Sequence, residues 1–210
     1  MTASAPIWTY VSAHRADVLD AIGTHAALSG TALAVAALVC IPLGIWCSRS
    51  AAGPAVVSAF ATARVVPSLA VLTLMLPLLG LGFAPALVAL VLLACPPVLI
   101  NTYVGFRDVD SGAKESALAM GMTPSGILRR VETPLAFPAV IAGVRTAAVE
   151  VIASATLATF IGGGGLGDLI NNGLQLNDAA MLTTGAACVA LMALCAELAL
   201  SGAARLVRTG

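Results

Sequence analysis

The sequence predicts an all-α integral membrane protein with about five transmembrane helices, and three observations support this fold class. Hydrophobic residues make up 60% of the 210 residues and charged residues only 10%, whereas a soluble domain usually has about 25% charged residues. The mean hydropathy is +1.01. Ala, Leu, Val and Gly dominate the composition, and small residues let helices approach closely within lipid.

Five apolar segments are long enough to cross the hydrocarbon core, which is about 30 Å thick and requires roughly 20 helical residues. They are residues 26–47, 55–79, 84–106, 134–161 and 179–200. Several of them contain prolines, which neighbouring helices can accommodate by satisfying the freed carbonyl groups. These prolines indicate either packing kinks or hinges for opening a pathway. The predicted transmembrane domain covers residues 26–200, between an N-terminal segment (1–25) and a tail (201–210).

The four links between these spans differ in kind. Residues 48–54 form a short turn, and residues 80–83 form a tight apolar turn. Residues 107–133 form a long polar link of helical character, and residues 162–178 form a glycine-rich loop.

Lys and Arg are distributed unequally between the two sides of a five-span arrangement. The first turn, the long link and the tail carry seven of them: Arg49, Arg107, Lys114, Arg129, Arg130, Arg205 and Arg208. The opposite side carries only Arg15. Because cytoplasmic loops are enriched in these residues, we expect the N-terminal segment to be extracytoplasmic and the long link and tail to be cytoplasmic. This pattern requires an odd number of spans.

The long link contains signals for two short helices. Asp110 is placed to cap the first helix, and Gly121 is placed to end it. Thr123 is placed to cap a second helix that has Pro124 at its first position. We expect residues 133–134 to end that helix, where the fourth span begins. The result is a helix-turn-helix on the cytoplasmic face that is too polar to insert into the membrane.

This link resembles the E-A-A-x3-G-x9-I-x-L-P motif of the membrane subunits of bacterial ABC importers. The corresponding residues are Glu115, Ser116, Ala117, Gly121, Val131, Thr133 and Pro134, with every spacing kept. Ser116, Val131 and Thr133 depart from the commonest residues, and Thr133 in place of leucine is the least conservative change. The resemblance implies the type I ABC importer permease fold, in which this segment is the coupling helix that fits a groove on an ATPase subunit. Gly121 would allow close approach of the partner, and Glu115 would offer it a charge.

Three further blocks resemble permeases that import glycine betaine, carnitine, choline and similar osmoprotectants. These are V-P-S-L-A at residues 66–70, the third-span residues Pro96, Pro97, Asn101, Thr102 and Gly105, and F-I-G-G-G-G-L-G at residues 160–167. The resemblance implies a quaternary ammonium substrate. A methionine-type amino-acid permease is an alternative, although that group lacks the I-P-S-L-A block. An ion-driven secondary carrier is a further alternative, but such carriers often contain inverted repeats, and no internal repeat is evident here.

The resemblance also implies that the chain lies in the bacterial cytoplasmic membrane and works with three protein partners. They are an ABC ATPase subunit that binds ATP and Mg, a second permease subunit (a copy or a sister chain), and an extracytoplasmic substrate-binding protein. The chain itself has no G-x-x-x-x-G-K-[ST] phosphate loop, so we expect no catalytic role and no cofactor of its own. A glycine-rich segment, with Gly162, Gly164, Gly165 and Gly167, is expected to form a tight outer turn onto which another protein docks.

Several charged residues lie within the predicted spans, where charges are costly unless they face protein or water. They are Arg64, Arg145, Glu150 and Glu197. Each belongs either to a structural ion pair or to the lining of a translocation path. The five cysteines lie in or beside apolar runs and the two histidines are isolated, so no metal site is expected. The net charge is zero, which offers no case for binding nucleic acid.

Overall fold

The computed structural model describes the backbone of residues 7–208 and the side chains of residues 7–202. Within these residues the regular structure is helical throughout, which confirms the predicted fold class. The helices are α1 (Ile7–Ala13), α2 (Arg15–Arg49), α3 (Gly53–Ala63), α4 (Ser68–Leu79), α5 (Phe83–Arg107), α6 (Ser111–Ala119), α7 (Pro124–Ile127), α8 (Thr133–Ala155), α9 (Leu166–Gln175) and α10 (Ala179–Arg208). A π-helical turn (Leu128–Glu132) precedes α8, and a 3-10 helix (Thr156–Ile161) follows it.

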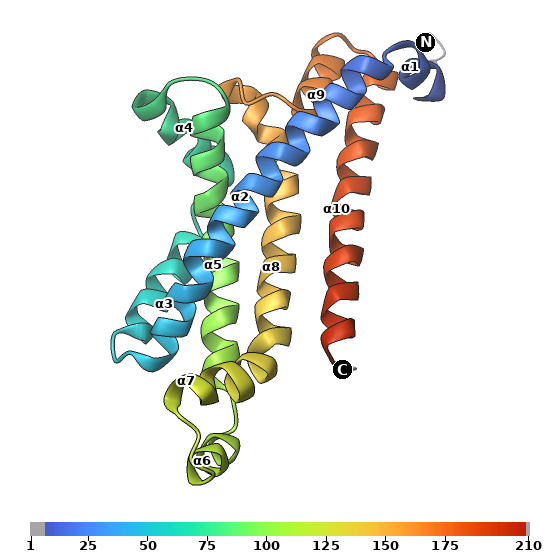
Figure 1. Cartoon of the computed structure of the whole chain (residues 1–210). Coiled ribbons are helices and arrows are strands. Elements are labelled where there is room, and N and C mark those ends of the chain that lie inside the picture. The colour runs from blue at the N-terminus through green and yellow to red at the C-terminus, as the bar shows by residue number, and fades with distance from the viewer. Residues whose placement is uncertain (1–6, 209–210) are drawn as a thin grey trace.

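Four helical stretches of the described chain are long and apolar enough to cross a membrane: Arg15–Arg49, Phe83–Arg107, Pro124–Ile161 and Ala179–Gly202. A fifth crossing is made if α3 and α4 count as one broken span. Figure 1 shows the long helices arranged as a bundle, with α6 and α7 at one end and α1 and α9 at the other.

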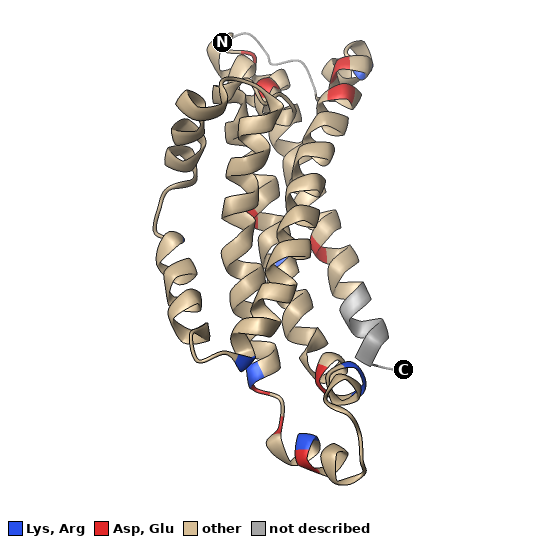
Figure 2. Cartoon of the chain, turned by 60° about the vertical axis from the view of Figure 1, so that its left-hand side comes forward, with Lys and Arg blue, Asp and Glu red and all other residues tan. Residues whose placement is uncertain are grey.

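The second predicted span, residues 55–79, is not a continuous helix. It breaks between α3 and α4, whose axes are bent by 94°, and Figure 2 shows the two segments joined by an extended stretch. Pro67, with φ −60° and ψ 137°, immediately precedes α4. Proline cannot donate a helical hydrogen bond and pushes the residue before it out of the helical region. Pro67 falls inside the predicted span of residues 55–79, but it lies at the break, directly before α4.

Two other boundaries differ from those predicted. The helix of the first predicted span, α2, begins at Arg15 rather than at residue 26, because hydropathy marks only the apolar part of a helix that continues into polar sequence. The predicted glycine-rich loop of residues 162–178 contains α9. Leu166 and Leu169 of this helix are buried beside Val18 of α2, so tertiary packing stabilises a helix that the glycines had obscured.

The core lies where α2, α5 and α8 meet, with α10 packed on α8 and α9. Glycine permits close contact of α5 with both of its neighbours. A Cβ atom at Gly44 of α2 would lie 2.7 Å from Cβ of Thr102, and one at Gly143 of α8 would lie 2.7 Å from the backbone oxygen of Pro97. Close approach of this kind is how membrane helices gain van der Waals contact.

His25 is fully buried, and its Nε2–H donates a hydrogen bond to the backbone oxygen of Ile152, 3.0 Å away. In the sequence His25 is only an isolated histidine with no recognisable role. The bond joins α2 to α8 across a large sequence separation, so no local pattern could have indicated it.

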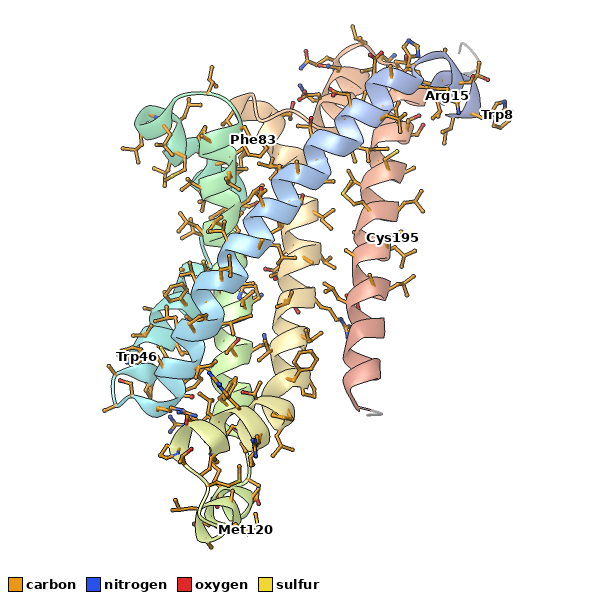
Figure 3. All side chains as sticks on the ribbon, viewed as in Figure 1. Trp8, Arg15, Trp46, Phe83, Met120 and Cys195 are labelled. Atoms are coloured by element: carbon orange, nitrogen blue, oxygen red, sulfur yellow. The ribbon has the colours of Figure 1, made fainter. Side chains whose placement is uncertain are left out.

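The two ends of the bundle differ in their content of Lys and Arg. Figure 3 places Trp8 and Arg15 at one end and Met120 at the opposite end, and Figure 2 shows Lys and Arg concentrated toward the end that carries α6 and α7. This distribution agrees with the uneven charges seen in the sequence. The side chains of Arg205 and Arg208, in the predicted tail, lie outside the described residues.

Candidate functional site

The long polar link folds into α6 and α7, and the predicted caps start both helices. The Oδ2 atom of Asp110 accepts a hydrogen bond from the backbone N–H of Ala113 at 2.9 Å. The Oγ1 atom of Thr123 accepts one from the backbone N–H of Gly126 at 3.2 Å, and Pro124 is the first helical residue. Each cap satisfies a donor that the first turn of a helix leaves free.

Gly121 ends α6 in the left-handed region, with φ +79°. Its N–H donates to the oxygen of Leu118 at 2.9 Å, and the N–H of Met122 donates to the oxygen of Ala117 at 3.1 Å. These two bonds form a Schellman motif, which favours glycine at this position. Apart from its two neighbours in sequence, no described residue has an atom within 4 Å of where a Cβ atom would be, so the space beside Gly121 is open to a partner.

The other motif residues of α6 divide between the surface and the interior. Glu115 and Ser116 are exposed, and Ala117 is buried. Leu118 and Met120 are 62% and 75% exposed at this end of the molecule. Large apolar side chains exposed outside the bundle indicate a protein contact. Neither residue was among those predicted for the site, although large apolar residues within a polar link were the available signal.

Residues 133–134 do not end the second helix, contrary to the prediction. The helix continues from α7 through the π-helical turn into α8, and Thr133 Oγ1 donates to the oxygen of Leu128, five residues earlier, at 2.7 Å. The wider turn accommodates Pro134, which has no N–H to donate. Val131 is half-buried in this turn, and Pro134 is exposed. The link is therefore connected to the fourth span by uninterrupted helix.

Two contacts hold this unit against the bundle. Arg49, at the end of α2, forms an ion pair with Glu132 of the π-helical turn. Leu128 of the same turn packs against a cluster in which Phe106, Val109 and Val140 are buried. We call α6, α7 and the π-helical turn the coupling unit (residues 111–132).

A cavity of about 770 Å³ lies beside the break between α3 and α4. Its lining includes Phe60, Arg64, Val71, Leu93, Pro96, Glu150 and Ser154. Arg64 Nη2 lies 2.7 Å from Glu150 Oε1, and the side chains are 44% and 38% exposed. Arg64 is the residue that follows α3, so the break in the second span positions its side chain toward α8.

The remaining charges of the spans form a separate pair, in which Arg145 of α8 bonds to Glu197 of α10. Arg145 and Glu150 are five residues apart in α8. They do not pair with each other, because residues five apart on one helix do not share a face. The structure thus confirms ion pairs for all four residues, and it brings only the Arg64–Glu150 pair into the cavity.

The glycine-rich segment is more deeply packed than an outer docking turn would require. Gly162 is exposed and Gly164 half-buried, and both have positive φ. Gly165, also with positive φ, is buried against the backbone of His25, while a Cβ atom at Gly167 would lie 2.1 Å from the oxygen of Thr156. Gly165 and Gly167 therefore serve packing within the chain. Docking of another protein at Gly162 and Gly164 stays a prediction.

The chain matches a protein family and several characterised relatives along most of its length. Residues 40–209 match the family described as binding-protein-dependent transport system inner membrane component. The glycine betaine/carnitine/choline transport system permease protein OpuCB of Bacillus subtilis is 40% identical over 187 residues, covering 89% of this chain and 86% of that protein. The osmoprotectant import permease protein OsmY of Salmonella typhimurium is 39% identical over 187 residues, covering 88% and 79% respectively.

The fold also matches a solved structure. The inward-facing MetNI methionine ABC transporter has a chain that superposes with a TM-score of 0.80 and 20% identity, covering 91% of this chain and 96% of that one. At this level of identity the likeness establishes a shared fold and nothing about the substrate. The fold is therefore that of an ABC importer permease, as the sequence resemblance implied.

Proposed function

The chain belongs to the family of inner-membrane components of binding-protein-dependent transport systems, and on that basis we propose that it carries quaternary ammonium osmoprotectants across the bacterial cytoplasmic membrane. The observation that carries the substrate class is the set of relatives about 40% identical over most of the chain, whose names specify glycine betaine, carnitine or choline transport. A methionine-type substrate is supported only by the likeness of fold to MetNI.

The continuous helix through the coupling unit supports a mechanism for using the energy of ATP. One end of this helix lies beside Gly121 and the exposed apolar residues, and Glu150 lies at the cavity near the other end of α8. A rigid helix transmits a displacement at one end to the other. Closure of the ATPase around ATP would therefore tilt α8 and open or close the path at Glu150, as a rigid-body switch.

The proposed mechanism requires other subunits. A separate ATPase, which binds ATP and Mg, docks on the coupling unit, and an extracytoplasmic binding protein delivers the solute. A second permease, either a copy or a sister chain, completes the path, because one five-span unit has too few helices to enclose a gate. The chain binds no cofactor of its own in this scheme.

Uptake by the reconstituted transporter tests this proposal. Liposomes that contain the permeases and the ATPase should accumulate glycine betaine or choline only with ATP and the binding protein. High-affinity selection is assigned to the binding protein, because a tight site in the path would slow release. Calorimetry on the permease–ATPase subcomplex alone should show no binding tighter than about the millimolar range, roughly −4 kcal/mol. Absence of uptake, or micromolar affinity in this subcomplex, would contradict the respective part of the proposal.

The membrane orientation is tested by labelling with an impermeant thiol reagent. Asn172 and Ser125 are both exposed and belong to opposite predicted sides. In a cysteine-free background, a single cysteine at Asn172 should react in intact cells, and one at Ser125 should react only after the membrane is opened. Labelling of both from outside would refute the orientation inferred from Lys and Arg.

A further inference from the structure

The ion pair in the cavity lies at the middle depth of the bundle. The cavity contacts α5 at Leu92, Leu93 and Pro96, and these residues are close to the midpoint of Phe83–Arg107. At 1.5 Å per residue, each end of α5 is about 15–20 Å away. A hydrocarbon core about 30 Å thick therefore has its midplane near Arg64 and Glu150.

An ion pair at this depth requires a polar surrounding on its open side. Arg64 and Glu150 keep 44% and 38% of their side-chain surface exposed. If that surface faced lipid, both charges would lie in hydrocarbon, which is strongly unfavourable. The face formed by α3, α4 and α8 around the cavity must therefore border water or another protein, as a translocation path does.

The cavity presents two opposite charges and an aromatic ring to whatever enters it. A guanidinium group binds carboxylates through two parallel hydrogen bonds. A carboxylate attracts a quaternary ammonium group, and an aromatic face such as that of Phe60 adds cation–π attraction. Among the described residues that line the cavity, Phe60 is the only aromatic one. A volume of about 770 Å³ is within the range of small-molecule sites, about 300–1,000 Å³.

We propose that the Arg64–Glu150 pair is a substrate station that opens to hold solutes carrying both a carboxylate and a quaternary ammonium group. The solute carboxylate takes the place of Glu150 on Arg64, while its ammonium group lies between Glu150 and Phe60. One ion pair is exchanged for two, so neither protein charge is left unpaired. This inference rests on the proposed function and extends it, because it separates zwitterionic betaines from choline, which has no carboxylate.

The exchange also accounts for weak binding at this station. Entry of the solute must first break the 2.7 Å contact between Arg64 and Glu150, and this cost offsets much of the gain from the new contacts. The solute can therefore leave toward the cytoplasm, where the protein pair forms again. A station of this kind discriminates between solutes without retaining them.

Paired uptake measurements test the station in the complete transporter of permeases, ATPase and binding protein. Arg64→Gln should lower the ratio of glycine betaine to choline uptake about tenfold, because a charge-assisted bond to the carboxylate is lost. Arg64→Lys keeps the charge without the bidentate geometry and should lower the ratio by a smaller factor. Glu150→Gln removes the ammonium partner and should reduce uptake of both solutes.

Arg145→Gln is the matched control, because Arg145 also pairs with a glutamate but does not line the cavity. It should leave the betaine-to-choline ratio unchanged. An unchanged ratio in both Arg64 variants, with normal wild-type uptake, would overturn the station alone. A wild-type transporter that imports neither solute would overturn the proposed function and the station with it.

Discussion

Replacing Gly121 with arginine should lower ATP-driven uptake by about 30-fold or more, because disrupting a hot spot of an interface costs about 2 kcal/mol or more. Gly121 lies at the end of α6, with open space beside it. A long charged side chain would occupy the surface that we expect the ATPase to approach. The measurement is uptake in liposomes together with the ATPase activity that the binding protein stimulates.

Gly121→Asn separates the effect on docking from the effect on the backbone. Any side chain at Gly121 must accept a φ of +79°, which costs roughly 1–2 kcal/mol for most residues but is tolerated by asparagine. The asparagine variant should therefore keep most of its uptake, and both variants should reach the membrane in equal amounts. Glu115→Ala should have a milder effect than Gly121→Arg. Wild-type uptake by Gly121→Arg would show that this segment is not the coupling helix.

Replacing Gly143 with alanine should destabilise the fold by about 1–3 kcal/mol, the usual cost of forcing an extra group into a packed interior. The added Cβ atom would lie 2.7 Å from both the oxygen of Pro97 and Cβ of Asn101. Backbone cannot move aside as a flexible side chain can, so α5 and α8 would have to separate. The measurement is the midpoint of thermal unfolding of the purified chain in detergent, which should fall.

Gly30→Ala is the matched control for this prediction. Gly30 also lies in a long helix, but no atom lies within 4 Å of where its Cβ would be. Alanine is favoured over glycine within a helix by about 0.5–1 kcal/mol, so the midpoint should stay unchanged or rise slightly. Equal shifts in the Gly30 and Gly143 variants would contradict the close packing of α5 on α8.

Local sequence signals were sufficient for the spans, the helix caps and the coupling motif. A run of about 20 apolar residues identifies a crossing without knowledge of its neighbours. The caps at Asp110 and Thr123 and the glycine at 121 act on residues within one turn, so their roles could be predicted from spacing alone. The uneven distribution of Lys and Arg between the two ends of the bundle could also be predicted from the sequence alone.

Tertiary structure decided the features that depend on residues far apart in the chain. Arg64 and Glu150 are 86 positions apart, and hydropathy carries no information about which charges meet. The continuation of helix past Pro134 depends on a π-helical turn that packing against α2 and α5 supports. The helix α9 forms because Leu166 and Leu169 are buried against α2 and α10. In each case the stabilising contacts are made by other helices, so the energy that selects the conformation is absent from the local sequence.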